Sequence, residues 1–179
     1  MIGALAGCAS LPSAPPAAEP APASVDAPFS IGGRISARHG RDGVAGTFAW
    51  THDGSHDAIE LSTPLGQTIA QLEGDAREVT VRLADGRVER APDWSRLTEH
   101  AFGVTIPVKG LSTWLRGIPR ANARFDVEHD DAGRVALLRQ DGWEIVYAYD
   151  AASRRPMRLS LQYPGAEAIE VRIVVDRWQ

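Results

Sequence analysis

Residues 143–149 read Trp-Glu-Ile-Val-Tyr-Ala-Tyr, so large apolar side chains alternate with smaller or polar ones. Residues 157–163 and 169–175 repeat this period of two. Alternate side chains of a strand point to opposite faces of a sheet, so such a pattern is typical of strands with one buried face. The C-terminal part of the chain therefore predicts three half-buried strands.

The same alternation extends back to Phe29 and predicts about eleven short strands. Asp85-Gly86 predicts a two-residue hairpin turn. Two stretches break the pattern, and residues 92–102 and 108–116 are expected to form short helices, the second ending before Gly117. The predicted strands are 29–36, 44–50, 57–62, 68–73, 79–83, a sixth through Val88, 125–129, 135–140, 143–150, 157–163 and 169–178.

These segments do not alternate strand–helix–strand, which disfavours a parallel sheet. We expect a mainly β fold with short helices, in which residues 28–179 form a half-open antiparallel β-barrel of about eleven strands. The two helices would cover its open side as a lid. A half-barrel of this kind can enclose an apolar cavity.

The N-terminus carries a separate signal. Leu5-Ala6-Gly7-Cys8 matches the lipobox of bacterial lipoproteins, in which the cysteine is acylated and becomes the first residue of the mature chain. Residues 1–7 would then be a truncated signal peptide, because they lack the basic segment and the long apolar run that such peptides carry. Residues 8–27, rich in Ala and Pro, are expected to form a flexible leader behind the lipid anchor. Ala9 rather than Asp after the cysteine suggests the outer membrane, by likeness to proteobacterial lipoprotein sorting.

The composition disfavours several classes of function. The chain has 179 residues, 44% of them hydrophobic, and a formal net charge of −4, so a nucleic-acid-binding face is not expected. Cys8 is the only cysteine, which leaves no internal disulfide and no cysteine zinc site. The stretch from His52 to Asp57 holds metal-capable side chains, but its Asp-Gly-Ser core is ordinary turn chemistry. Asp57 and Glu60 fall on opposite faces of a predicted strand. We expect no enzyme, no cofactor and no metal.

Two features of the apolar residues remain open at this stage. The five tryptophans either fill a core or line a cavity for acyl chains. Thr63-Pro64-Leu65-Gly66-Gln67 joins two predicted strands, and Leu65 either folds back into the core or touches a membrane. The candidate residues of a cavity and its lid are Phe48, Trp50, Leu111, Trp114, Leu115, Ile145 and Tyr147.

The order of these elements resembles the LolB family of outer-membrane lipoprotein receptors, over roughly residues 29–178. The segments that carry the resemblance are Phe29-Ser30-Ile31-Gly32-Gly33-Arg34-Ile35, Gly46-Thr47-Phe48-Ala49-Trp50, Pro64-Leu65-Gly66, Gly103-Val104-Thr105-Ile106-Pro107-Val108, Leu111-Ser112-Thr113-Trp114-Leu115-Arg116-Gly117-Ile118-Pro119, Gln140-Asp141-Gly142-Trp143-Glu144-Ile145-Val146-Tyr147 and Arg155-Pro156.

The resemblance implies a receptor in the periplasm, lipid-anchored to the outer membrane. It would accept lipoproteins from a LolA-like periplasmic carrier, hold their acyl chains in an apolar cavity and insert them into outer-membrane lipid. Pro64, Leu65 and Gly66 would form the membrane-insertion loop, and Trp114 and Leu115 would belong to the lid. A monomer is expected.

Two other classes of function remain as alternatives. A lipidated structural or assembly protein of the outer membrane would have a filled core without a cavity. An envelope hydrolase would bring polar groups with shifted pKa values together at the cavity mouth.

Overall fold

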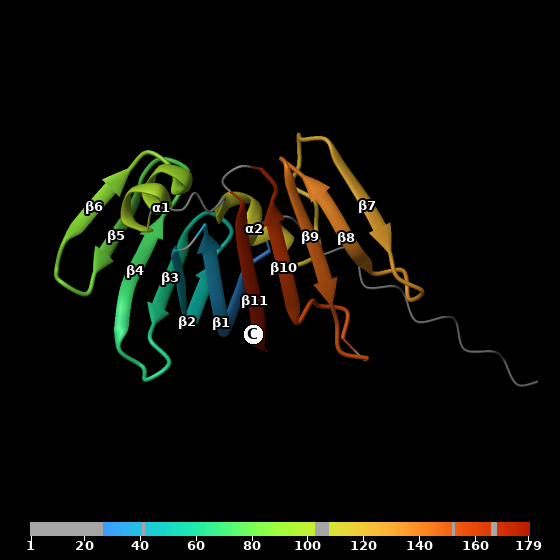
Figure 1. Cartoon of the computed structure of the whole chain (residues 1–179), viewed down its shortest axis with the longest axis horizontal. Coiled ribbons are helices and arrows are strands. Elements are labelled where there is room, and N and C mark those ends of the chain that lie inside the picture. The colour runs from blue at the N-terminus through green and yellow to red at the C-terminus, as the bar shows by residue number, and fades with distance from the viewer. Residues whose placement is uncertain (1–26, 41, 103–107, 152, 166–167) are drawn as a thin grey trace, which may run out of the picture.

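A series of antiparallel hairpins builds one curved sheet (Figure 1). The computed structural model describes residues 27–40, 42–102, 108–151, 153–165 and 168–179. Eleven strands follow one another in the order β6-β5-β4-β3-β2-β1-β11-β10-β9-β8-β7. The strands are β1 (Phe29–His39), β2 (Asp42–His52), β3 (Asp57–Ser62), β4 (Thr68–Gly74), β5 (Val79–Leu83), β6 (Val88–Ala91), β7 (Phe125–His129), β8 (Val135–Gln140), β9 (Trp143–Ala148), β10 (Arg158–Tyr163) and β11 (Ile169–Trp178).

The sheet curves strongly without closing. Every neighbouring pair of strands is antiparallel, and within the described ranges β6 and β7 are the end strands and do not pair with each other. Among the described strands, only β1 and β11 are neighbours that are not consecutive in the chain. The half-open antiparallel barrel of about eleven strands is thereby confirmed.

Close backbone contacts accompany the curvature at the centre of the sheet. The register between β1 and β11 shifts at Gly32/Gly33, and such bulges bend and twist a strand. A Cβ atom at Gly33 would lie 2.0 Å from the carbonyl oxygen of Val174. Only glycine fits here without moving the neighbouring strand.

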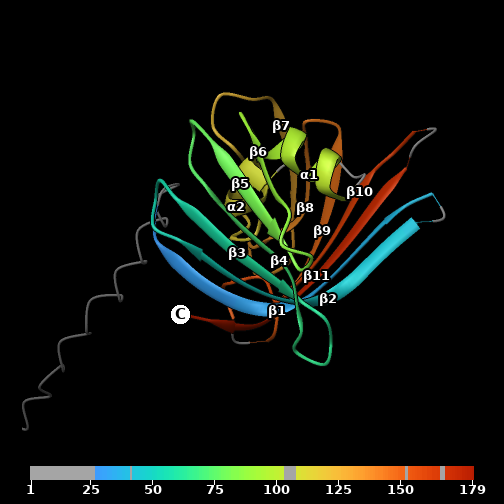
Figure 2. The same ribbon diagram turned by 90° about the vertical axis from the view of Figure 1, so that its left-hand side faces the viewer.

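The two helices lie on the concave side of the sheet (Figure 2). Helix α1 (Trp94–Phe102) begins behind Asp93, whose Oδ1 accepts a 2.9 Å hydrogen bond from the backbone N–H of Arg96 and so caps the first turn. Helix α2 (Val108–Trp114) is followed by a turn that closes at Gly117, where φ is 71°. The N–H groups of Gly117 and Ile118 bond back to the carbonyls of Trp114 and Thr113, the Schellman pattern of a helix end. Both predicted helices are confirmed.

One predicted turn is wrong in type. The two-residue turn at Asp85-Gly86 is a three-residue loop, because Leu83 and Arg87 close the hairpin through a 2.9 Å backbone bond and only Gly86, not Asp85, has a positive φ. This is a type I turn followed by a left-handed glycine. The pairing of Arg82 with Val88 sets the loop length, and the dipeptide alone did not reveal it. A two-residue turn with both φ values positive occurs instead at Asp141-Gly142.

A continuous apolar core fills the concave side. It runs from Phe29 and Ile31 on β1, across Val79 and Val81 on β5, to Leu138 on β8 and the buried faces of β9, β10 and β11. Neither described helix is long and apolar enough to cross a membrane.

Candidate functional site

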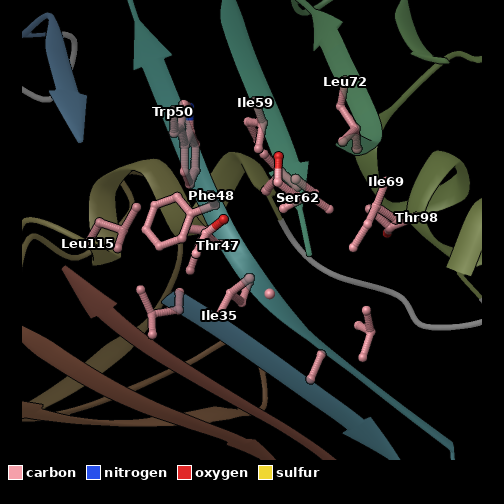
Figure 3. Close-up of a pocket in the computed structure, with 17 residues that line it drawn as sticks. Ile35, Thr47, Phe48, Trp50, Ile59, Ser62, Ile69, Leu72, Thr98 and Leu115 are labelled. Carbon is pink, nitrogen blue, oxygen red and sulfur yellow. The ribbon is translucent and has the colours of Figure 1, made fainter. Parts of the chain in front are cut away.

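A cavity lies between the concave face of strands β1–β4 and the helices (Figure 3). Its volume is about 80 Å³. Ile35, Phe48 and Ile59 form part of its wall from the sheet, and Val108 and Leu111 border it from α2. Such a site can hold an apolar ligand, because its wall offers almost nothing but hydrocarbon.

The polar content of the wall is small. Among the described residues that border the cavity none is ionisable, and side-chain hydroxyls come only from Thr47, Ser62 and Thr98. The Thr98 hydroxyl already donates to carbonyl oxygens of its own helix, as serine and threonine often do in helices. No group of three or more His, Cys, Asp or Glu side chains that could hold a metal occurs in the described ranges.

The structure brings together four of the seven residues expected at the cavity and its lid. Phe48, Trp50, Leu111 and Leu115 all border the cavity. The other three do not border it. Trp114 is fully buried at the end of α2, and Ile145 and Tyr147 lie in the core on β9, on the other half of the sheet.

A buried polar cluster lies beside Trp50, on the same face of β2 and β3 as the residues that border the cavity. The indole Nε1 of Trp50 donates to Oδ1 of Asp57 at 2.7 Å, and Nδ1 of His52 lies 2.9 Å from the same oxygen. His52 and Asp57 pair directly across the β2–β3 hairpin. Phe29 stacks on the His52 ring at 5.2 Å. The sequence predicts Trp50 and Asp57 on the two strands that flank this turn but does not join them. The antiparallel pairing of those strands was the signal that could have done so.

The turn itself is as predicted. Asp53 accepts hydrogen bonds from the backbone N–H groups of Ser55 and His56, at 3.1 and 2.8 Å. These two donors favour the charged carboxylate and lower the pKa of Asp53. Asp57 and Glu60 lie on opposite faces of β3, one buried and one exposed.

Helix α2 is held at its C-terminal end. The indole Nε1 of Trp114 donates to Oε1 of Gln140 on β8 at 2.8 Å, and the amide of Gln140 also pairs with the backbone of Arg120. Beyond the helix, the guanidinium of Arg116 lies 5.5 Å from the ring centre of Phe29 and donates to the carbonyl of Ala27. These contacts fix one end of the cover over the cavity.

The loop between β3 and β4 carries the most exposed large apolar side chain of the described residues. Leu65 is 92% exposed, so it does not fold back into the core. The backbone of the loop is well defined: Gly66 N–H donates to the Thr63 carbonyl at 2.9 Å, and Thr63 N–H to the Gln67 carbonyl at 2.8 Å. Gly66 has a φ of 84°, which suits glycine best. Leu65 is therefore presented to solvent by an ordered turn.

Two other hairpins have the same loop backbone. Residues 83–87 and 130–134 show the same pair of backbone hydrogen bonds and a left-handed glycine at the same place. The position of Leu65 is occupied there by Asp85 and Ala132. The turn does not require a large apolar residue, so the exposure of Leu65 needs a reason other than folding.

Groups with shifted pKa values do not gather at the cavity. The four aspartates with lowered pKa values, Asp53, Asp75, Asp85 and Asp130, accept backbone N–H bonds in surface turns. Burial raises the pKa of Tyr147 well above its usual range and that of Tyr149 to about 12. Neither tyrosine borders the cavity. This arrangement does not favour an envelope hydrolase.

The family described as "Outer membrane lipoprotein LolB" has a model that matches residues 27–178. The chain belongs to the LolB family. The outer-membrane lipoprotein LolB of Thiobacillus denitrificans is 37% identical over 176 residues, covering 98% of this chain and 92% of the relative. The LolB of Chromobacterium violaceum is also 37% identical, over 179 residues, covering 98% of this chain and 93% of the relative. The resemblance seen in the sequence is confirmed, and with it the class of outer-membrane lipoproteins.

Solved structures support the fold assigned to this LolB-family chain. A LolA superfamily protein from Nitrosomonas europaea aligns with a TM-score of 0.52 at 11% identity, covering 86% of each chain. A DUF1329 family protein from Desulfovibrio piger aligns with a TM-score of 0.54 at 9% identity, covering 87% of each. At such identities the likeness concerns the fold alone. The expected lipid anchor at Cys8, the signal segment 1–7 and most of the leader 8–27 lie outside the described residues.

Proposed function

We propose that this protein is a lipid-anchored receptor at the outer membrane. It accepts lipoproteins from a LolA-like periplasmic carrier, shelters their acyl chains in the apolar cavity and inserts them into the membrane, acting as a monomer without catalysis. The observation that carries this proposal is the apolar cavity beneath the helices, which has no ionisable group among its described lining residues. Membership of the LolB family supports it.

The energetics explain why a receptor is needed. Exposing an acyl chain of about fourteen methylenes to water costs roughly 11 kcal/mol at about 0.8 kcal/mol per methylene. Release of cargo into water between carrier and membrane would therefore be very slow. The chains must stay covered during transfer, which favours contact between the two cavity mouths. Because no nucleotide-binding motif is present in the sequence, direction would come from rising affinity from carrier to receptor to bilayer.

The size of the cavity implies that the cover moves. A dry apolar cavity of about 150 Å³ admits a molecule the size of benzene. The cavity here, at about 80 Å³, is smaller than that and is too small for an acyl chain. Binding would require the helices to separate from strands β1–β4. Because Trp114 ties the C-terminal end of α2 to β8, we expect the opening on the side of α1 and Val108.

An acyl anchor at Cys8 belongs to this function. Acylation of Cys8 by two or three chains would hold the protein firmly, whereas a single chain binds membranes only marginally. Mass spectrometry of the mature protein, expressed with a full signal peptide, tests this directly. Cys8→Ser should yield an unmodified protein in the soluble fraction, and an acyl mass retained by that variant would contradict the assignment.

A transfer experiment tests the receptor function. The full chain with Cys8→Ser is mixed with carrier loaded with an acylated lipoprotein, and the cargo is followed by affinity pull-down, first alone and then with phospholipid vesicles added. We expect cargo to leave the carrier for this protein and then to enter the vesicles. Retention of all cargo on the carrier would reject the receptor and favour a structural role. Cleavage of the cargo would favour a hydrolase.

A further inference from the structure

The outer face of strands β10, β11 and β1 carries a group of arginines that the cavity does not use. We call this group the arginine row; it consists of Arg34, Arg38, Arg158, Arg172 and Arg177. The pairing of Arg158 with Val174 and of Val174 with Arg34 places both arginines on one line across three strands. All five side chains are exposed. Arg38, Arg158 and Arg172 alternate along their strands with buried residues of the core.

The charge of this face is opposite in sign to that of the chain as a whole. Two carboxylates, Glu170 and Asp176, lie among the five arginines, while the chain has a net charge of −4. On one side, the outer faces of β3 and β4 carry Glu60 and Glu73. On the other side, three carboxylates surround a single arginine, Arg139. The five arginines at the centre of the sheet are thus flanked by carboxylates on both sides, and Arg82 on β5 lies beyond Glu60 and Glu73 on the same face.

The arginines are only weakly neutralised within the chain. Arg34 pairs with Asp176 at 3.1 Å, with both side chains about half exposed or more, and Arg172 lies 3.9 Å from Glu170. Exposed pairs of this kind hold their charges loosely. Arg38, Arg158 and Arg177 form no ion pair with a described residue. Guanidinium groups in this state remain available to an external anion.

The arginine row faces the same way as the Leu65 loop. Arg34 pairs with Thr47, and Thr47 pairs with Ser62, the last residue before the loop. Two strand spacings separate Arg34 from Ser62, a distance of about 10 Å. Figure 2 shows the loop between β3 and β4 projecting beyond the sheet on the side away from the helices. An exposed leucine and a basic surface therefore lie next to each other on the convex side.

We propose that the arginine row docks on the phosphate headgroups of an anionic phospholipid bilayer, so that Leu65 points into the membrane. An apolar side chain flanked by basic residues is the pattern of proteins that bind membrane surfaces, and the guanidinium fork matches phosphate oxygens. This proposal rests on the receptor function, because it assigns to the arginine row the orientation of the delivery step. Headgroup binding turns the loop toward the bilayer before cargo is released.

The experiment measures vesicle binding by the full chain with Cys8→Ser, so that no acyl anchor contributes. The test variant adds Arg38→Gln, Arg158→Gln and Arg172→Gln. The control variant carries the same change of charge elsewhere, with Arg82→Gln, Arg90→Gln and Arg96→Gln. Co-sedimentation uses phosphatidylcholine vesicles with and without phosphatidylglycerol. We expect the test variant to bind the anionic vesicles on the order of tenfold or more weakly than its parent, with the control nearly unchanged.

Salt provides a second readout. At about 1 M salt the screening length falls to about 3 Å, so the parent should lose its preference for anionic vesicles. Equal binding of the test variant and its parent to anionic vesicles would overturn the proposal. The proposal would also be overturned if the test variant bound vesicles normally but no longer took up cargo from the carrier. The arginine row would then bind an acidic protein surface. Failure of the parent to deliver cargo to any vesicle would instead reject the receptor function itself.

Discussion

The indole Nε1 of Trp50 donates a 2.7 Å hydrogen bond to Oδ1 of Asp57. Trp50 borders the apolar cavity, whereas Asp57, two residues before Ile59 on β3, does not. Nδ1 of His52 lies 2.9 Å from the same carboxylate oxygen. In the tautomer with the proton on Nδ1, the imidazole donates a second hydrogen bond to Asp57. A buried acceptor thus sets the orientation of an apolar wall without exposing any charge to the cavity.

Asp57→Ala should destabilise the protein strongly. It leaves the indole N–H of Trp50 and the ring of His52 without their acceptor, and each buried unsatisfied group costs about 1–3 kcal/mol. We expect the free energy of unfolding to fall by about 2–5 kcal/mol in urea denaturation. The matched control is Glu60→Ala, an exposed carboxylate on the same strand, which should change it by less than about 0.5 kcal/mol. Equal effects of the two substitutions would show that the buried contact contributes nothing.

Leu65→Glu should leave folding intact but impair the delivery of cargo to the membrane. Because Asp85 occupies the equivalent position in a loop of the same backbone, a carboxylate at Leu65 fits the turn. We expect thermal stability within about 0.5 kcal/mol of the parent, near-normal uptake of cargo from the carrier, and transfer to vesicles reduced at least tenfold. Pull-down and vesicle flotation measure the two steps separately.

Leu65→Met keeps an apolar side chain of similar size and is the control. It should deliver cargo at close to the parental rate. If Leu65→Glu delivers cargo as fast as Leu65→Met, the exposed leucine has no role in insertion.

The strand faces could be predicted because alternation is a local property. Trp143, Ile145 and Tyr147 alternate with more exposed residues, and all three are buried as the period of two requires. Helix α2 could be predicted in the same way, since Leu111 and Trp114 lie three residues apart on the helix and both are buried. Side-chain direction along a regular element follows from spacing alone.

Features that depend on which strands pair, and in which register, could not be predicted from the sequence in this way. The Trp50–Asp57 bond exists because the β2–β3 register brings those strands together, and a shift of one residue would move Asp57 to the other face. Tyr147 has the same alternation as residues that border the cavity, but its strand lies on the other half of the sheet. Whether a buried residue faces a cavity or packed neighbours is set by tertiary structure, which periodicity does not encode.

Filling the cavity should block acyl binding. Ala37 borders the cavity from β1, and Ala37→Ile adds three carbon atoms toward free space of about 80 Å³. Since isoleucine suits a strand and the added volume meets a void, we expect stability to change by less than about 1.5 kcal/mol. Binding of a fluorescent fatty acid should weaken on the order of tenfold, as followed by titration.

Ala70→Ile is the matched control for the cavity. Ala70 is fully buried on β4 but does not border the cavity, so the larger side chain overpacks the core and should cost about 1–3 kcal/mol. Fatty-acid binding by the folded protein should persist. Undiminished binding by Ala37→Ile would mean that acyl chains occupy another place.

Gln140 holds the end of the lid. Gln140→Ala removes the acceptor of the Trp114 indole and both bonds to the backbone of Arg120. We expect a loss of about 2–4 kcal/mol in the free energy of unfolding and faster hydrogen exchange across α2. Gln140→Glu keeps an acceptor for both donors but sets a buried carboxylate oxygen against the Arg120 carbonyl, so it should also lose stability, while exchange across α2 should stay slower than in Gln140→Ala. Unchanged exchange in α2 of Gln140→Ala would show that the helix is held elsewhere.

Removing the hydroxyl group should change the free energy of unfolding in opposite directions at Tyr147 and Tyr149. The Tyr147 hydroxyl is buried without a hydrogen-bond partner among the described residues, whereas the Tyr149 hydroxyl donates to the Val135 carbonyl at 2.8 Å. Tyr147→Phe should therefore raise the free energy of unfolding by about 1 kcal/mol, because an unsatisfied buried group disappears. Tyr149→Phe should lower it by about 0.5–1.5 kcal/mol, because a hydrogen bond is lost.

The same pair predicts a loss of stability in alkali. Burial raises the pKa of Tyr149 from 10.0 to about 12 and that of Tyr147 further, so the unfolded chain gives up these protons at a lower pH than the folded one. The stabilisation is complete below pH 10 and is lost as the pH rises toward 12. Urea titrations at pH 9, 10 and 11 should give a falling free energy of unfolding, with a shallower slope for Tyr147→Phe. An identical slope in the parent and in Tyr147→Phe would mean that this hydroxyl ionises as easily in the folded protein as in the unfolded chain.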